Sequence, residues 1–174
     1  MTAASPPTIE LDVATFLGTG TLGTIRIGDS MNLLRETLPP AVDDGIDLPP
    51  GSAIWAYGTL ELHFVDDRLA LIWCDRLPDL RRSTTVDNIR VDPWIICEDK
   101  SRTLAEMLPE FAHQGWTLRL ADPSHRYSLT VHIIDSGVEL HFEESPTAND
   151  DAPPSWPEFE LVAFALRSPS EPPG

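Results

Sequence analysis

The sequence predicts an α+β fold of two imperfect repeats, each a helix packed on one face of an antiparallel β-sheet. The first observation is a short internal repeat, which we call the echo. Residues 60–64 are Leu-Glu-Leu-His-Phe, and residues 138–142 are Val-Glu-Leu-His-Phe. The second is that a helical pattern precedes each copy and a strand pattern follows it. We therefore expect a single domain over 1–174, with repeat one at about 22–80 and repeat two at about 89–167.

The first predicted helix begins after Asp29 or Ser30, both favourable N-cap residues. Met31, Leu34 and Leu38 follow at helical spacing. The two prolines at 39–40 end it, because proline cannot continue the hydrogen-bonding pattern.

The second predicted helix spans about 101–114. Thr103 and Glu106 fit a capping box, and Gly115 fits a left-handed C-terminal cap. Pro109 predicts a kink or a later start. The apolar stripe consists of Leu104, Met107, Leu108 and Phe111.

Strands are predicted where polar and apolar residues alternate, or where β-branched and aromatic residues gather. Beside the two echo strands, these segments are 9–13, 24–27, 54–57, 69–74, 116–120, 127–134 and 159–166. Tight hairpin turns are expected at 66–67 and 135–137. The Pro-rich segment 144–157 predicts an exposed loop, and the ends, 1–7 and 168–174, predict disordered tails.

The composition is strongly acidic, with 28 Asp and Glu against 12 Lys and Arg and a net charge of −16. This argues against a nucleic-acid partner, which would require a basic surface. The chain has no apolar run of membrane-spanning length, and its first residues lack a secretory pattern, so we expect a cytoplasmic protein without a membrane partner. Cys74 and Cys97 have no metal or redox spacing, which predicts buried thiols.

The run Ile-Arg-Ile-Gly-Asp-Ser-Met-Asn-Leu-Leu at 25–34, followed by Tyr-Gly-Thr-Leu-Glu-Leu-His-Phe at 57–64, carries a family resemblance. It resembles bacterial immunity proteins encoded beside polymorphic or contact-dependent toxins, over residues 22–75, about a third of the chain. The architecture is more distantly similar to helix-plus-sheet repeats of a β-lactamase inhibitor and of outer-membrane assembly lipoproteins. The resemblance implies a non-enzymatic protein that neutralises a cognate toxin.

Because the chain is strongly acidic, we expect its binding surface to be complementary in charge to a basic toxin. Complementary charge speeds the encounter of two proteins and disfavours wrong partners. We expect the protein to need no cofactor and to be a monomer when free. Trp156 is expected to be exposed, whereas Trp55 and Trp94 fit core packing better. The candidate partner-binding residues are Asp43, Asp44, Asp47, Glu61, His63, Asp66, Asp67, Glu139, His141, Glu143 and Trp156.

Two alternatives stay open. Glu61 with His63, Glu139 with His141, and His132 would form a metal site if the two echo strands were neighbours, giving a small metal-dependent enzyme or sensor. Alternating strands instead favour a solvated outer face for these side chains. A scaffold protein of unknown partner is the other alternative.

Residues 18–23 match the Gly-x-Gly-x-x-Gly pattern of dinucleotide-binding sites, and Asp43 follows 20 residues beyond. Such a pattern must open a helix, but residues 24–27 are strand-like. The sequence therefore predicts a glycine turn here rather than a dinucleotide site.

Overall fold

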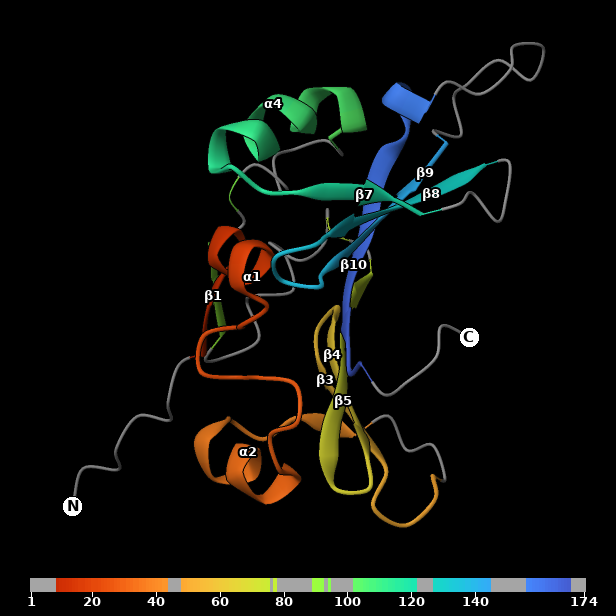
Figure 1. Cartoon of the computed structure of the whole chain (residues 1–174). Helices are drawn as coiled ribbons and strands as arrows, with labels where there is room; N and C mark the ends of the chain where they lie inside the picture. The colour runs from red at the N-terminus through yellow and green to blue at the C-terminus, as the bar shows by residue number, and fades with distance from the viewer. Residues whose placement is uncertain are drawn as a thin grey trace.

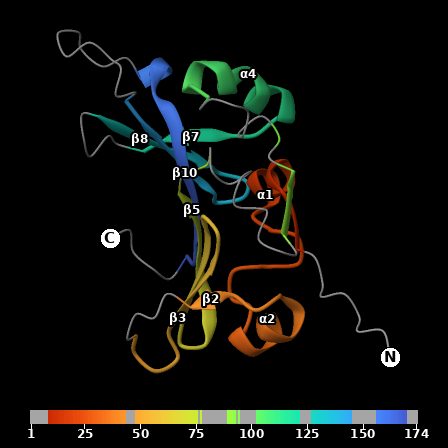
Figure 2. The same ribbon diagram turned by 180° about the vertical axis from the view of Figure 1, so that it is seen from behind.

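The molecule consists of an antiparallel sheet with helices on one side. The computed structural model describes residues 9–43, 48–75, 77, 89–92, 94, 102–121, 127–144 and 156–169. In this part of the chain, helices α1 (Val13–Thr19), α2 (Met31–Thr37) and α4 (Leu104–Gln114) all lie on the same side of the sheet (Figure 1). The view from behind shows the same arrangement (Figure 2). The predicted α+β class is confirmed.

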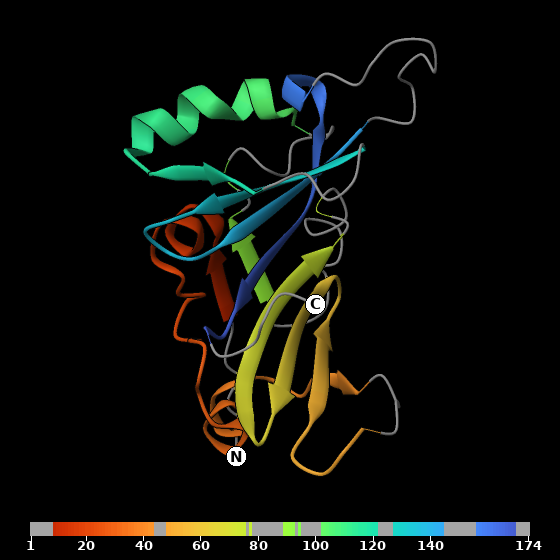
Figure 3. The same ribbon diagram turned by 45° about the vertical axis from the view of Figure 1, so that its right-hand side comes forward.

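The described sheet has eight strands in the order β2-β3-β4-β5-β10-β9-β8-β7, and all neighbours are antiparallel. One half contains β2 (Val42–Asp43), β3 (Ala53–Tyr57), β4 (Leu60–Val65) and β5 (Arg68–Asp75). The other contains β7 (Leu118–Leu120), β8 (Ser128–Ile133), β9 (Glu139–Glu143) and β10 (Glu160–Arg167). The halves join where β5 pairs with β10, as Figure 3 shows.

A second, two-stranded sheet lies beside α1 on the helix side (Figure 1). It pairs β1 (Ile9–Asp12) with β6 (Ile89–Asp92) in parallel. The predicted segment 9–13 is therefore mostly confirmed, but its last residue, Val13, already begins α1. Residues 89–92, placed at the start of repeat two, pair outside the main sheet. The sequence analysis did not predict this pairing with β1, because no local pattern in the sequence signals it.

Helix α1 is absent from the sequence prediction. Asp12 caps it by accepting a hydrogen bond from the Thr15 backbone N–H at 3.0 Å. Gly20, at φ 69°, ends it in the left-handed conformation. So short a helix is marginal by itself, and the burial of Phe16 and Leu17 in the core stabilises it.

The strand predicted at 24–27 is wrong. Leu22 and Ile25 form an isolated bridge around a turn, and the Arg26 backbone N–H donates to Asp29 Oδ2 at 2.8 Å. Gly23 and Gly28 have φ values of 60° and 90°, so the chain bends on both sides of this segment.

The two predicted helices are confirmed with their caps. Ser30 accepts from the Leu33 backbone N–H at 3.2 Å, and Thr103 and Glu106 form the capping box. Pro109 lies inside α4, which begins at Leu104 rather than 101. Leu108 is 44% exposed, so its place in the apolar stripe is wrong. Neither α4 nor any other described helix has the length and hydropathy to cross a membrane.

The core lies between the helices and the sheet. In β4, Leu60, Leu62 and Phe64 are buried, as predicted from their alternation. In β9, Leu140 and Phe142 are buried in the same way. No polar or charged residue is buried among the described positions. The side chains between these core positions must therefore point to the opposite side of the sheet.

Candidate functional site: the open face of the sheet

We call the side of the sheet that faces away from the helices the open face, because no described helix covers it (Figures 1 and 2). Strand alternation and cross-strand pairing identify its residues, since directly paired residues share a face. One row runs from Glu61 through Trp73, Ala165 and Glu139 to His132. The charged, histidine and tryptophan residues of the open face are Glu61, Asp75, Glu139, Glu143, Glu160, Arg68, Arg119, Arg167, His63, His132, His141 and Trp73.

Trp73 lies at the centre of this face. Its ring centroid is 5.4 Å from that of His141, which is on β9. Because β10 lies between β5 and β9, the indole must reach across β10 to make this contact. Ala163 and Ala165 of β10 are only 4% and 0% exposed, although no described helix covers them. Small side chains on β10 thus make room for the indole.

Glu139 is the centre of a charged cluster beside Trp73. Its Oε2 lies 3.4 Å from Arg167 Nε and 3.7 Å from His141 Nε2, and its Oε1 lies 3.8 Å from His132 Nδ1. The distance to His141 is too long for a hydrogen bond. His141 Nδ1 instead pairs with Thr130 Oγ1 at 3.2 Å.

The pKa of His141 is lowered, mainly because burial disfavours the imidazolium. The carboxylate of Glu139 acts in the opposite direction, while Arg167 and His132 lower the pKa further. The Nε2 atom of His141 is buried and has no hydrogen-bond partner among the described residues. The structure therefore holds His141 neutral at pH 7.

The two Glu-x-His pairs do not converge. His63 Nε2 contacts Glu61 Oε2 at 2.7 Å, and the second pair lies three strand spacings away, across β5 and β10, or about 14 Å. The described residues contain no group of three or more His, Cys, Asp or Glu placed to hold a metal ion. The condition for the predicted metal site, that the echo strands be neighbours, is not met.

The other predicted partner-binding residues lie apart from these pairs. Asp66 and Asp67 form the β4–β5 turn with φ of 49° and 59°, at one end of the sheet. Trp156, 41% exposed, begins the 3₁₀ helix η1 (Trp156–Glu158) near the other end (Figure 1). Asp43 is in the edge strand β2. Asp44 and Asp47 lie outside the described residues, as does Cys97, whereas Cys74 is buried as predicted.

Five of the predicted residues therefore share the open face: Glu61, His63, Glu139, His141 and Glu143. Sequence reasoning missed Trp73 and Arg167. The segment 69–74 is almost entirely apolar, so its tryptophan looks like a core residue. Only the structure shows that Trp73 pairs with the outward-facing Glu61, because a β-bulge between His63 and Phe64 shifts the register of β4 and β5.

A hollow of about 520 Å³ opens beside His63 and Arg167. Ile54, Leu71 and Val65 supply apolar wall, and none of the described residues that line the hollow is acidic. Over the whole open face, by contrast, the five acids outnumber the three arginines. An apolar hollow within an acidic surface can hold an apolar side chain whose neighbours are basic.

No protein-family model, curated protein or solved structure matches this chain. The resemblance to immunity proteins therefore remains a prediction from the motifs at residues 22–75.

Proposed function

We propose that this chain is a non-enzymatic immunity protein that binds and neutralises a cognate basic toxin in the cytoplasm through the open face. The observation that carries the proposal is the placement of all described helices on one side, which leaves an acidic sheet surface opposite them. The net charge of −16 would attract a basic partner, and the five acids of the open face would orient it.

Trp73 and the hollow beside His63 would supply the affinity. Binding energy at interfaces concentrates in a few aromatic or apolar contacts that exclude water, with charged groups around them. Trp73 is held by its neighbours on β9 and β10, so little side-chain entropy would be lost on binding. Glu61 and Glu143 would then meet basic side chains around these contacts.

We also propose that the sheet is a duplicated unit, as the echo at 60–64 and 138–142 predicts. Glu61 pairs with Trp73, and its counterpart Glu139 pairs with Ala165. Trp73 and Ala165 therefore hold equivalent positions, and they pair with each other. That pairing is expected when a local two-fold axis passes between two copies of one unit.

The helix starts support the same correspondence. Ser30, the N-cap of α2, bridges to the first residue of β5, and Thr103, the N-cap of α4, bridges to the first residue of β10. The Met31 backbone N–H donates to the Asp67 carbonyl at 2.9 Å, and the Leu104 N–H donates to the Phe159 carbonyl at 2.9 Å. Related sequences in which the first half aligns with the second would test the duplication.

The test of function uses the purified full chain and the product of the adjacent gene. We expect direct binding in calorimetry, and protection of cells when the two genes are expressed together. Trp73→Ala should weaken binding at least tenfold, in the range of an interface hot spot. Glu61→Lys with Glu143→Lys should slow association and reduce its dependence on salt.

Glu10→Lys with Glu36→Lys is the matched control, because it changes the net charge equally at exposed positions on the helix side. Absence of binding to the neighbouring gene product, together with indifference of the cells, would overturn the proposed function. Binding that responds equally to both double variants and ignores Trp73→Ala would keep the function and reject the open face.

A further inference from the structure

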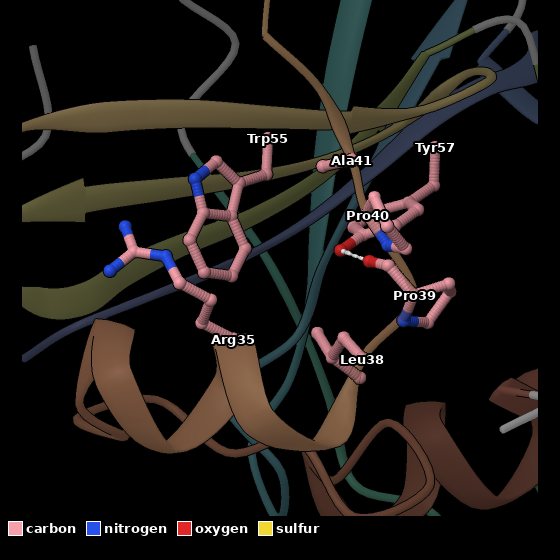
Figure 4. Close-up of a pocket in the computed structure, with 7 residues that line it drawn as sticks. All are labelled: Arg35, Leu38, Pro39, Pro40, Ala41, Trp55 and Tyr57. Carbon is pink, nitrogen blue, oxygen red and sulfur yellow. Dashed lines mark hydrogen bonds between the residues drawn. The ribbon is translucent and has the colours of Figure 1, made fainter. Parts of the chain in front are cut away.

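We propose that a second pocket, on the helix side between α2 and β3, binds a carboxylate carried on an aromatic body. The pocket has a volume of about 430 Å³ and is shown in Figure 4. Its walls are Arg35, Leu38, Pro39, Pro40, Trp55 and Tyr57, together with Ala41. The site is separate from the open face, so it does not depend on the proposed function.

The walls of this pocket are fixed before any ligand arrives. The Tyr57 hydroxyl donates to the Pro39 carbonyl at 3.0 Å, drawn as a dashed line in Figure 4. Tyr57 is only 4% exposed, and Pro39 and Pro40 restrict the backbone of the turn that follows α2. A ligand would therefore bind without ordering this side of the pocket.

Trp55 provides a flat apolar surface. Its ring packs against Phe64 in the core, with a centroid distance of 4.5 Å, and the indole is only half-buried. Because the prolines end α2 after seven residues, no further helical turn covers the indole. An aromatic ring can pack beside the exposed part of Trp55, against Leu38 and Pro40.

Arg35 provides the positive charge. Its guanidinium carbon lies 5.6 Å from the centre of the Trp55 ring, and its Nη1 donates to Asn32 Oδ1 at 3.2 Å. Its Nη2 contacts Met31 Sδ at 3.3 Å. Among the residues whose side chains the structure describes, no carboxylate pairs with Arg35 and no acid lines the pocket, although the chain has 28 acidic residues. A guanidinium has five N–H donors, so donors remain for a carboxylate.

These features select the ligand class. The guanidinium favours a carboxylate over its neutral amide, and the stacked arrangement favours an aromatic body over a charged or strongly hydrated one. A pocket of this volume lies within the range of small-molecule sites and holds one aromatic acid. The same chemistry occurs in a free aromatic acid and in the C-terminal phenylalanine of a peptide.

The experiment follows the tryptophan indole N–H signals of the full chain by NMR, with the Trp55 signal assigned through Trp55→Phe. The probe is 3-phenylpropionate, and its amide is the neutral comparison. We expect a saturable shift of the Trp55 signal with a dissociation constant on the order of 1 mM, as is usual for a fragment of this size. The amide should bind at least tenfold more weakly.

Arg35→Gln should weaken binding of the acid at least tenfold, and Arg35→Lys should have an intermediate effect, because lysine keeps the charge but loses the planar donors. Arg119→Gln is the matched control, since it removes an exposed arginine from the open face and should leave the affinity unchanged. Undisturbed signals outside the pocket establish that each variant is folded.

A second arm compares a short peptide ending in phenylalanine with its C-terminal amide. Tighter binding of the free peptide than of 3-phenylpropionate would identify a protein C-terminus as the source, and weaker binding would identify a free acid. The proposal is overturned if the Trp55 signal does not shift, if acid and amide bind equally, or if Arg35→Gln binds as the unmodified chain does.

Discussion

Trp73 and Ala165 pair directly across the β5–β10 boundary in the middle of the sheet. The two residues occupy corresponding places in their halves, but they differ greatly in size. The indole extends over β10 to His141, and the alanines beneath it are almost completely buried. The centre of the open face therefore depends on a large side chain on one strand and small ones on the next.

Ala165→Leu should displace the indole. The extra carbon atoms would occupy space next to Trp73, and overpacking of this kind costs about 1–3 kcal/mol of unfolding free energy. Urea denaturation measures the loss, and near-ultraviolet circular dichroism reports the altered tryptophan environment. Ala56→Leu, at a half-exposed position on the same face, should change the unfolding free energy by less than about 0.5 kcal/mol. Equal effects at both positions would contradict this packing.

Acid should destabilise the fold through His141. Its folded-state pKa is lower than the ordinary 6.5, so the unfolded chain binds the proton more readily. The contribution to stability is fully present above pH 6.5 and is lost as the pH falls below it. Urea denaturation between pH 5 and 8 should show a smaller loss for His141→Gln than for the unmodified chain. Identical pH dependence in both would refute this role of His141.

Tyr57 should resist ionisation. Burial raises its pKa to about 12 from the ordinary 10.0. Because the folded-state pKa is raised, the stability from Tyr57 is complete below pH 10 and is lost as the pH rises through 12. In the Tyr127→Phe variant only one tyrosine remains, so absorbance at alkaline pH reports Tyr57 directly. Ionisation at pH 10 with the fold intact would contradict the buried hydroxyl.

Gly20→Ala should destabilise the protein more than Gly28→Ala. Both glycines have positive φ, which costs alanine about 1–2 kcal/mol. A Cβ atom at Gly20 would also lie 2.8 Å from the Ser136 carbonyl oxygen, whereas one at Gly28 would have no neighbour within 4 Å. We expect a total of about 2–4 kcal/mol at Gly20 in urea denaturation. Similar losses at both positions would show that the close approach to Ser136 relaxes without cost.

Local patterns were sufficient where the signal lies within a few residues. Thr103 and Glu106 predicted the N-terminal cap of α4, because a capping box is made by residues three apart. The alternation of Leu60, Leu62 and Phe64 predicted which side of β4 is buried. Helix α1 escaped prediction because its stability comes from the contact of Phe16 with Phe164, which is distant in sequence.

The sequence by itself determined the α+β class, the helix caps, the hairpin turns and the outward position of the two Glu-x-His pairs. The tertiary structure decided that β5 joins β10, which separates those pairs by about 14 Å and places Trp73 between them. It also decided that Arg35 lies over Trp55. Capping and alternation are set by near neighbours in the chain, whereas strand order and side-chain contacts between elements depend on how distant segments bury their apolar surface together.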